Sequence, residues 1–244
     1  MIIKQGTEIN FTLNPDENVR LITAPGVFTP NVTTNLLVQA VNSVISNPIK
    51  LLDLGCGTGI VGLALYLKGL VESPLYASDL SVPSIYCSRE NFKHHNCPAD
   101  VREGSLFEPW QGEKFDVIVD DISGISQSVA DVSPWFQEVP CDTGRDGIDL
   151  VADIIQKAPQ HLNEGGYFFF PVLSLSNVDK LLDCASKTFA SVVRVGRQDW
   201  PLPPDLKEHM GLLQKLHEAG AIKLEKKFGM VVCYTEVYCA KNPL

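Results

Sequence analysis

The sequence predicts an α/β fold with a doubly wound, mostly parallel sheet of seven strands. Continuous apolar runs alternate with amphipathic stretches along most of the chain. Such runs are typical of parallel strands that are buried on both faces and joined by helices. A glycine-rich turn follows the first long run, and the chain contains no internal repeat or low-complexity tract. We therefore expect one central sheet, preceded by a small hairpin and with a helical insertion before its last strand.

The N-terminal part is expected to form a hairpin and then a helix. Residues 8–12 and 18–23 are strand-like and flank the turn sequence Asn-Pro-Asp-Glu-Asn. Thr29 is suited to cap the helix, with Pro30 at its first position. Apolar residues then recur at helical spacing. Residues 1–30 are thus predicted to be an N-terminal extension.

The main domain, residues 31–244, is expected to alternate strands and helices after that first helix. Its strands are predicted over residues 50–55, 75–79, 100–104, 115–120, 167–173, 191–197 and 230–240. Its further helices are predicted over residues 59–69, 83–95, 148–162 and 177–188. The insertion, residues 198–229, has a Pro-rich entry and one expected helix at 205–218. A lid over a site and ordinary packing both agree with this composition.

Composition restricts the class of protein. The chain has 244 residues and a formal net charge of −9, which argues against an electrostatic grip on nucleic acid or on anionic membranes. No apolar run approaches the ~20 residues of a membrane span, and the start lacks the apolar core of a signal peptide. Seven cysteines without a Cys-x-x-Cys pair indicate reduced thiols in a cytoplasmic protein.

A zinc site is the sharper interpretation of some of these cysteines. It would use Cys87, His94, His95 and Cys97, which lie close together in the sequence. Their spacing is unlike that of known zinc ligands, so we expect no metal.

The strongest motif is the turn Leu-Leu-Asp-Leu-Gly-Cys-Gly-Thr-Gly after the first predicted strand of the sheet. Asp53 stands near the strand end, and Gly55, Gly57 and Gly59 follow at every second position. These glycines permit a sharp turn and a close approach of a ligand, and the free N–H groups of the following helix point toward it. Asp79, at the end of the next strand, is placed to accept hydrogen bonds from ribose hydroxyls. The pattern therefore predicts a nucleoside cofactor, while a glycine turn without a cofactor is the plainer alternative.

Two cofactor classes compete for this turn. Gly57, Gly59 and Gly62 match the Gly-x-Gly-x-x-Gly fingerprint of nicotinamide enzymes. However, Asp53 lies two residues before Gly55, the first glycine of the turn, and an acid there suits a cationic amino-acid tail instead. The stretch resembles motif I of the class I S-adenosylmethionine (SAM) methyltransferases, which are Rossmann-like. In that family the acid would hold the methionine end, Asp79 the ribose, and Leu80 would pack on adenine. The cofactor site implied by this resemblance comprises Asp53, Gly55, Cys56, Gly57, Gly59, Asp79, Leu80, Ser105, Leu106 and Asp120.

Four further stretches narrow the resemblance. They are Pro-Gly-Val-Phe-Thr-Pro (25–30), Glu-Gly-Ser-Leu-Phe-Glu-Pro (103–109), Phe-Asp-Val-Ile-Val (115–119) and the segment 144–170 with Gly-Arg-Asp-Gly-Ile-Asp. Together they resemble the protein-glutamine N5-methyltransferases that modify release factors. The resemblance covers about residues 25–173.

Three departures separate this chain from that family. The family carries Asn-Pro-Pro-Tyr after its fourth strand, whereas this chain has Asp121, Ile122, Ser123 and Gly124. An ionised Asp121 accepts a hydrogen bond but does not donate one, so the grip on a substrate amide is incomplete. The family usually has Asp where Ser105 stands, and its bacterial members have a helical N-terminal domain that is not seen here.

Asp120 and Asp121 are the predicted catalytic residues. A carboxylate at this strand end is placed to orient a hydroxyl or a protonated amine, or to take its proton. The structural alternative is that both acids only finish the turn after the strand. Residues expected to contact the acceptor, or alternatively only to pack, are Phe28, Ser123, Trp135 and Phe136.

The preferred function is a SAM-dependent methyltransferase whose acceptor is a small molecule or a protein side chain. The alternatives are a glutamine methyltransferase with a relaxed clamp and a SAM-fold protein that binds a partner without catalysis. A nicotinamide oxidoreductase is the most distant reading. The acidic composition makes nucleic acid the least expected acceptor, and nothing in the sequence indicates an oligomeric state.

Overall fold

The computed structural model describes residues 6–122, 124–133 and 143–244. The chain divides into two compact units. Unit 1 comprises Met1–Asp121 and Gln160–Phe169, and unit 2 comprises Ile122–Pro159 and Phe170–Leu244. Strand β7, Leu162–Leu173, begins in unit 1 and ends in unit 2.

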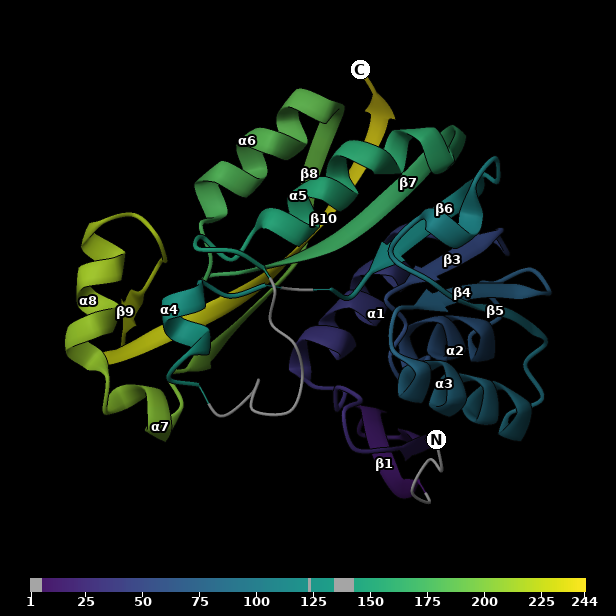
Figure 1. Cartoon of the computed structure of the whole chain (residues 1–244), viewed down its shortest axis with the longest axis horizontal. Helices are drawn as coiled ribbons and strands as arrows, with labels where there is room; N and C mark the ends of the chain where they lie inside the picture. The colour runs from purple at the N-terminus through teal and green to yellow at the C-terminus, as the bar shows by residue number, and fades with distance from the viewer. Residues whose placement is uncertain (1–5, 123, 134–142) are drawn as a thin grey trace. The chain divides into compact units, whose positions relative to one another are not determined.

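The core of unit 1 is a parallel sheet. Its hydrogen-bonded order is β5 (Ala99–Glu103), β4 (Leu75–Asp79), β3 (Leu51–Leu54), β6 (Phe115–Asp120) and the first part of β7 (Figure 1). Each neighbouring pair in this order runs parallel. All four residues of β3 are buried, as expected for a central strand in a sheet of continuous apolar runs.

In the described part of unit 1, three α-helices and one short 3₁₀ helix accompany this sheet. They are α1 (Val32–Val44), α2 (Ile60–Leu67), α3 (Val82–His94) and η1 (Glu108–Trp110). The alternation of strands and helices follows the order predicted from the apolar periodicity.

The start of α1 differs from the sequence prediction. The N-cap is Asn31 rather than Thr29, so Pro30 precedes the helix instead of opening it. The Asn31 side chain accepts a hydrogen bond from the N–H of Thr33 at 2.8 Å, and Thr34 completes a capping box. Asn satisfies the free N–H groups of a first turn at least as well as Thr, which explains the shift.

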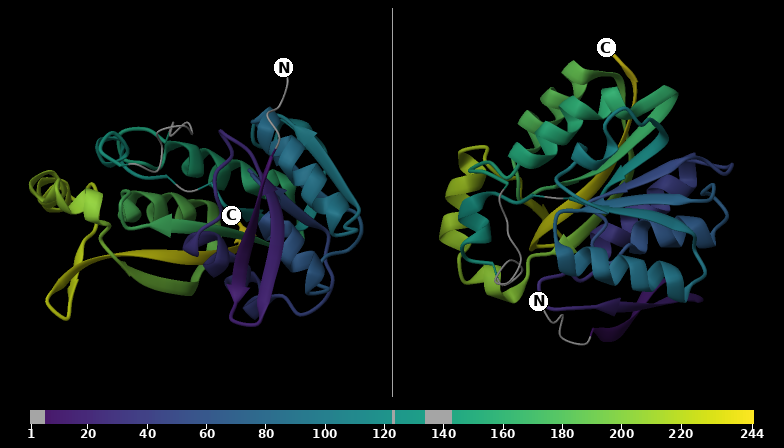
Figure 2. Two further views of the ribbon diagram at one scale, coloured as in Figure 1. Left: turned by 90° about the horizontal axis from the view of Figure 1, so that it is seen from below. Right: turned by 45° about the vertical axis from the view of Figure 1, so that its right-hand side comes forward.

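The predicted N-terminal hairpin is present in unit 1. β1 (Thr7–Asn14) and β2 (Glu17–Thr23) pair antiparallel, and β2 lies against α3; Figure 2 shows both strands in purple. The buried side chain of Asn91 in α3 exchanges hydrogen bonds with the N–H and C=O of Ile22 at 2.6 and 2.9 Å. The hairpin is therefore fastened to the helix by polar contacts as well as by packing.

Unit 2 contains the end of β7 followed by β10 (Met230–Pro243) and β8 (Phe189–Pro201), which pair antiparallel. The short strand β9 (Glu225–Lys227) also pairs with β10. The helices of this unit are α4 (Gln127–Ala130), α5 (Asp149–Lys157), α6 (Val178–Thr188), α7 (Pro204–Lys207) and α8 (Met210–Glu218).

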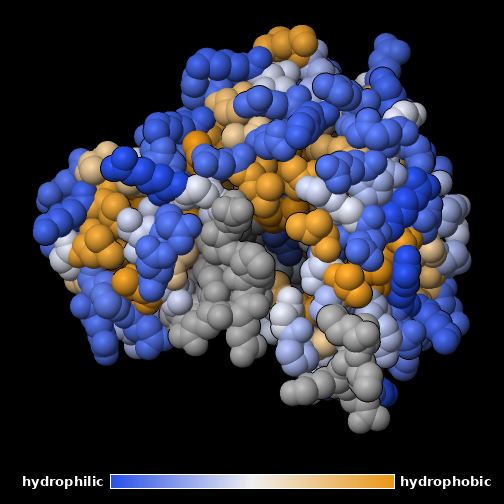
Figure 3. All heavy atoms as spheres, in the orientation of Figure 1, coloured by the Kyte–Doolittle hydropathy of each residue, from blue (hydrophilic) through white to orange (hydrophobic). Residues whose placement is uncertain are grey.

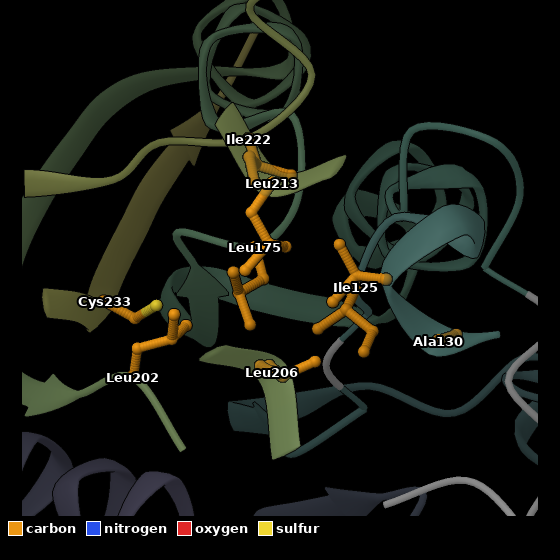
Figure 4. Packing of buried hydrophobic residues seen from close by; sticks show 9 residues of the cluster. Ile125, Ala130, Leu175, Leu202, Leu206, Leu213, Ile222 and Cys233 are labelled. Atoms are coloured by element: carbon orange, nitrogen blue, oxygen red, sulfur yellow. The ribbon is translucent and has the colours of Figure 1, made fainter. Parts of the chain in front are cut away.

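The insertion before the last strand packs into a core of unit 2. Leu206 of α7 and Leu213 of α8 are fully buried with Leu175 and Ile222, and Figure 4 shows these side chains converging. A role of this segment as a lid stays a prediction.

Several elements differ from those predicted, and β7 and β8 are both longer than expected. The helix expected over 148–162 ends at Lys157 and continues as a 3₁₀ turn, Ala158–His161. Pro159 lies in that turn, and a proline lacks the N–H that an α-helical hydrogen bond requires. The single helix expected over 205–218 is two helices, α7 and α8, and β9 was not predicted at all.

The predicted fold class is confirmed: an α/β protein with a mostly parallel sheet, a small antiparallel hairpin and a helical insertion before the last strand. On the face shown in Figure 3, hydrophilic residues surround smaller hydrophobic areas. Within the described ranges, no helix is long and apolar enough to span a membrane.

Candidate cofactor and acceptor site

The candidate site lies at the carboxyl edge of the parallel sheet in unit 1. Leu54, the last residue of β3, pairs with Ser78 of β4 and with Asp120 of β6. Parallel strands end at the same edge, so the residues that follow these positions gather there. The structure thus brings together the predicted glycine turn and the acids that follow β4 and β6.

The glycine turn has the backbone that its sequence requires. Gly55, Gly57 and Gly59 have φ angles of 68°, 53° and 79°, a region that favours glycine. A Cβ at Gly59 would lie 2.6 Å from the ring of Phe92, so this glycine serves packing. A Cβ at Gly57 would meet nothing within 4 Å, so this part of the turn faces open space.

Asp53 is fully buried beneath the turn. Its Oδ2 accepts the N–H of Gly62 at 2.9 Å and so caps the first turn of α2. Its Oδ1 is buried and has no hydrogen-bond partner in the described part of the chain. Burial raises the pKa of Asp53 to about 7, opposed by the Gly62 N–H and reinforced by the nearby carboxylates of Asp121 and Asp79.

Gly62 is a positioning residue that the sequence analysis considered only as part of a competing fingerprint. A Cβ there would lie 3.0 Å from Asp53 Oδ2 and 2.9 Å from Leu75 Cδ2. The absence of a side chain therefore allows Asp53 to reach the helix N–H. The Gly-x-Gly-x-x-Gly spacing was the signal that marked this position.

Asp79 fastens the glycine turn to the end of β4. Its Oδ2 accepts the N–H of Gly57 at 2.9 Å, and its Oδ1 accepts the N–H of Ser81 at 2.8 Å. Burial is the main cause that raises its pKa. Hydrogen bonds from the Ser81, Gly57 and Leu80 N–H groups and from the Ser84 side chain oppose that rise. The next residue, Leu80, is 71% exposed.

The other predicted cofactor residues lie around the same edge. Cys56 is buried in the turn, and burial raises the pKa of its thiol well above the usual range, so the thiol is neutral. Ser105 and Leu106 follow β5; the carbonyl of Ser105 accepts the N–H of Glu108 at 2.9 Å, and Leu106 has a φ of 48°. Both side chains are partly buried.

Asp120 and Asp121 end β6 in different surroundings. Asp120 is fully buried, whereas Asp121 is partly buried. Asp121 Oδ2 accepts a hydrogen bond from the hydroxyl of Thr34 in α1 at 2.8 Å. Burial raises the pKa of Asp121 to about 7, opposed by that hydrogen bond. No sequence motif pointed to Thr34, because the contact joins positions 87 residues apart.

The predicted acceptor residues are only partly described. Phe28 is 38% exposed in the segment before α1. Ser123, Trp135 and Phe136 lie outside the described residues. Their contact with an acceptor therefore stays a prediction.

The residues of the alternative zinc site have other contacts. Cys87 packs with Ala24 and Val27, and the His95 ring contacts the carbonyl of Arg20 at 2.8 Å. In the part of the chain that the structure covers, no group of three or more His, Cys, Asp or Glu residues is placed to hold a metal ion.

The residues present fit the methionine, ribose and adenine parts of SAM. The buried Asp53 Oδ1 and Thr58 Oγ1 lack partners among the described residues, which suits a ligand that supplies donors. Gly57 leaves open space, Asp79 places a hydrogen-bonding carboxylate beside the turn, and Leu80 offers an exposed apolar surface to a base.

Comparisons with known proteins agree with this geometry. Residues 18–121 match a family model described as methyltransferase small domain. A release factor glutamine methyltransferase from Geobacter sulfurreducens is 27% identical over 175 residues, which cover 68% of this chain and 60% of the relative. A ribosomal RNA small subunit methyltransferase C from Haemophilus influenzae is 27% identical over 157 residues, 62% of this chain and 40% of that protein. The chain thus spans about half the length of these relatives.

The fold also matches a solved structure. The putative methyltransferase SMU.776, complexed with SAH, superposes with a TM-score of 0.56 at 12% identity, over 95% of this chain and 56% of that chain. Residues 18–121 are therefore similar to the methyltransferase small domain, and the described part of the chain has a fold like that of this solved methyltransferase.

Proposed function

We propose that this protein is a SAM-dependent methyltransferase whose acceptor is a small molecule or a protein side chain. The observation that carries the proposal is the open glycine turn at Gly57, which is flanked by Asp53 with an unpartnered buried oxygen and is held by Asp79. The family match over residues 18–121 and the relatives named as methyltransferases support it.

Each residue of the turn has a distinct task in this proposal. Asp53 receives the ammonium of the methionine end, Asp79 receives the ribose hydroxyls, and Leu80 packs on adenine. When bound, SAM supplies a methyl group on a sulfonium, an already activated donor. The protein then has to position and desolvate the acceptor and manage its proton.

Asp121 is the group that faces the acceptor. Thr34 occupies its Oδ2, which leaves Oδ1 to accept a hydrogen bond from an incoming N–H or O–H. With a pKa of about 7, Asp121 is substantially ionised at neutral pH. An ionised Asp121 orients a protonated amine or a hydroxyl and takes its proton as the methyl group is transferred.

A second function, glutamine methylation, is favoured by one specific observation. Because the pKa of Asp121 is about 7, a large fraction carries a proton on the acid side of neutrality. A protonated carboxyl has an O–H donor beside an acceptor oxygen, and so resembles a side-chain amide, which also offers both kinds of group, at the position of the family's Asn. The release factor glutamine methyltransferase among the relatives supports this alternative.

The pH dependence of the rate separates the two functions. We would measure methyl transfer from labelled SAM into protein, RNA and low-mass fractions of a cell lysate, between about pH 6 and pH 8. A base role predicts a rate that rises through about pH 7, and a glutamine clamp predicts a rate that falls through it.

The variant Asp121→Asn is the matched test because it has the family's residue and nearly the same shape. Under the base role it loses about 100-fold or more in rate. Under the glutamine clamp it stays active and loses the dependence on pH. Label in the RNA fraction would indicate that the acceptor is RNA, the class of acceptor named for the Haemophilus relative. Absence of transfer in every fraction, with SAM still raising the melting temperature, would contradict catalysis and favour a binding protein.

A further inference from the structure

Thr34 connects the N-terminal cap of α1 to Asp121. Its hydroxyl donates to Asp121 Oδ2 at 2.8 Å, and the same oxygen accepts the N–H of Asn31 at 3.4 Å. A threonine hydroxyl has a single hydrogen, so the contact with Asn31 leaves that hydrogen directed at Asp121. Thr34 is 1% exposed, and water therefore does not compete for either bond.

The cap holds this hydroxyl in place. Asn31 Oδ1 accepts the N–H of Thr33 at 2.8 Å, which fixes the first turn of α1 where Thr34 stands. Thr34 is β-branched, and its χ1 angle has few choices inside a helix. The backbone and the side chain of Thr34 are thus both constrained before any ligand binds.

We propose that Thr34 is a positioning residue for Asp121: it holds Oδ2 and presents Oδ1 as the atom that accepts a proton or a hydrogen bond from the methyl acceptor. The proposal rests on the proposed function, in which Asp121 faces the acceptor, and adds the residue that orients it. The acceptor group is accordingly one that donates, an N–H or an O–H.

The effect of Thr34 on the pKa of Asp121 adds to the effects of burial and of the neighbouring acids. Two other acids lie near Asp121, namely Asp53 of β3 and the preceding residue, Asp120. The charge of Asp79 raises the pKa of Asp53, and the first turn of α1 contains no acidic residue. The Thr34 hydrogen bond favours the ionised form of Asp121 and opposes the effect of burial. Loss of the hydroxyl therefore raises the pKa of Asp121 further.

The test is a titration of the ligand-free protein. Carbon-13 NMR of labelled aspartate carboxyls follows Asp121, whose signal is assigned by its loss in Asp121→Asn. Thr34→Val removes the hydroxyl at nearly constant shape, and we expect its midpoint to rise by roughly one pH unit. Thr34→Ser restores the hydroxyl and should return the midpoint to the wild-type value.

Asn31→Ala is the matched control, because it removes the cap side chain but keeps the N–H that Thr34 accepts. We expect a lower melting temperature and a midpoint that rises much less than in Thr34→Val, because the hydroxyl remains and only its support is weakened. A Thr34→Val midpoint equal to wild type, or an equal rise in Asn31→Ala, would overturn the proposal.

Methyl transfer provides the second readout. Thr34→Val should lower kcat by about 10-fold or more with an unchanged KM for SAM, and Thr34→Ser should recover most of the rate. An unchanged kcat despite a shifted midpoint would overturn the positioning role. Failure of the proposed function is distinguishable, since wild type would then neither bind SAM nor transfer methyl groups, and the titration alone would decide whether Thr34 orients Asp121.

Discussion

The ends of strands β3 and β6 lie side by side, and each holds an acid through a different kind of hydrogen-bond donor. Each carries an acid whose pKa burial raises to about 7. Asp53 is held by the N–H of Gly62, nine residues further along the chain. Asp121 is held by the hydroxyl of Thr34, 87 residues away. The contact that holds Asp53 thus lies within one motif, whereas the contact that holds Asp121 crosses the fold.

This difference determines which substitutions remove each of the two hydrogen bonds. A backbone N–H is present whatever the residue, so the contact to Asp53 depends on glycine spacing alone. A side-chain hydroxyl is present only in certain residues, so the contact to Asp121 depends on a particular pair. A substitution at position 34 can therefore remove the contact to Asp121, whereas only proline at position 62 would remove the N–H that Asp53 accepts.

The largest expected effect is on the pH dependence of stability. The pKa values of Asp53 and Asp121 rise from 3.8 to about 7 on folding, so the folded protein binds more protons than the unfolded chain between these values. The free energy of unfolding therefore falls as pH rises from about 4 to 7, by up to ~4 kcal/mol for each group. Urea unfolding across this range measures the slope.

Replacing each of the two acids by Asn shows how much each contributes to the slope of stability against pH. Asp53→Asn and Asp121→Asn should each reduce the slope, because an amide keeps the accepting oxygen and does not ionise. A slope that both variants leave unchanged would show that other groups cause it.

Asn91 tests whether the glycine turn also depends on a contact from outside its own motif. Its amide donates to the carbonyls of Thr58 and Ile22 at 2.9 Å each, and its Oδ1 accepts the N–H of Ile22. Asn91→Ala leaves these buried groups unsatisfied and should cost about 2–4 kcal/mol in the free energy of unfolding. The exposed Lys93→Ala in the same helix should change it by less than about 0.5 kcal/mol. Equal effects would remove Asn91 from the structural account.

Gly62 and Gly211 give the smallest expected effects, and they have opposite signs. Gly62→Ala places a Cβ against Asp53 Oδ2 and Leu75, and should destabilise by about 1–3 kcal/mol. Gly211 in α8 has nothing within 4 Å of an added Cβ, so Gly211→Ala should stabilise by about 0.5–1 kcal/mol through helix propensity. Thermal unfolding of both variants measures the contrast, and destabilisation in both would contradict it.

The parts of the molecule that follow local rules could be predicted from the sequence. The parallel sheet follows from continuous apolar runs, and the glycine turn from spacing that only glycine satisfies. The N-cap of α1 was misplaced because Thr29 and Asn31 both suit a cap, and the choice depends on which of them precedes a Thr at the third helical position. Helix α5 is shorter than its apolar periodicity predicts, because Pro159 cannot supply the N–H of an α-helical hydrogen bond.

The acceptor end shows where such prediction stops. Asp121 was recognised as a departure from a family motif, but its partner Thr34 has no fixed sequence distance from it. Only the fold brings α1 to the end of β6. The acids themselves were predicted, whereas their pKa values depend on burial that no local pattern reports.

Calorimetric titration of S-adenosylhomocysteine, the product form of SAM, into wild type, Asp79→Ala and Asp121→Ala tests the central claim most directly. The account predicts similar binding by wild type and Asp121→Ala, and about 100-fold or more weaker binding by Asp79→Ala, which loses its charged contacts to ribose and to the Gly57 N–H. No binding by wild type, or an equal loss in both variants, would contradict a cofactor site separate from the acceptor residue.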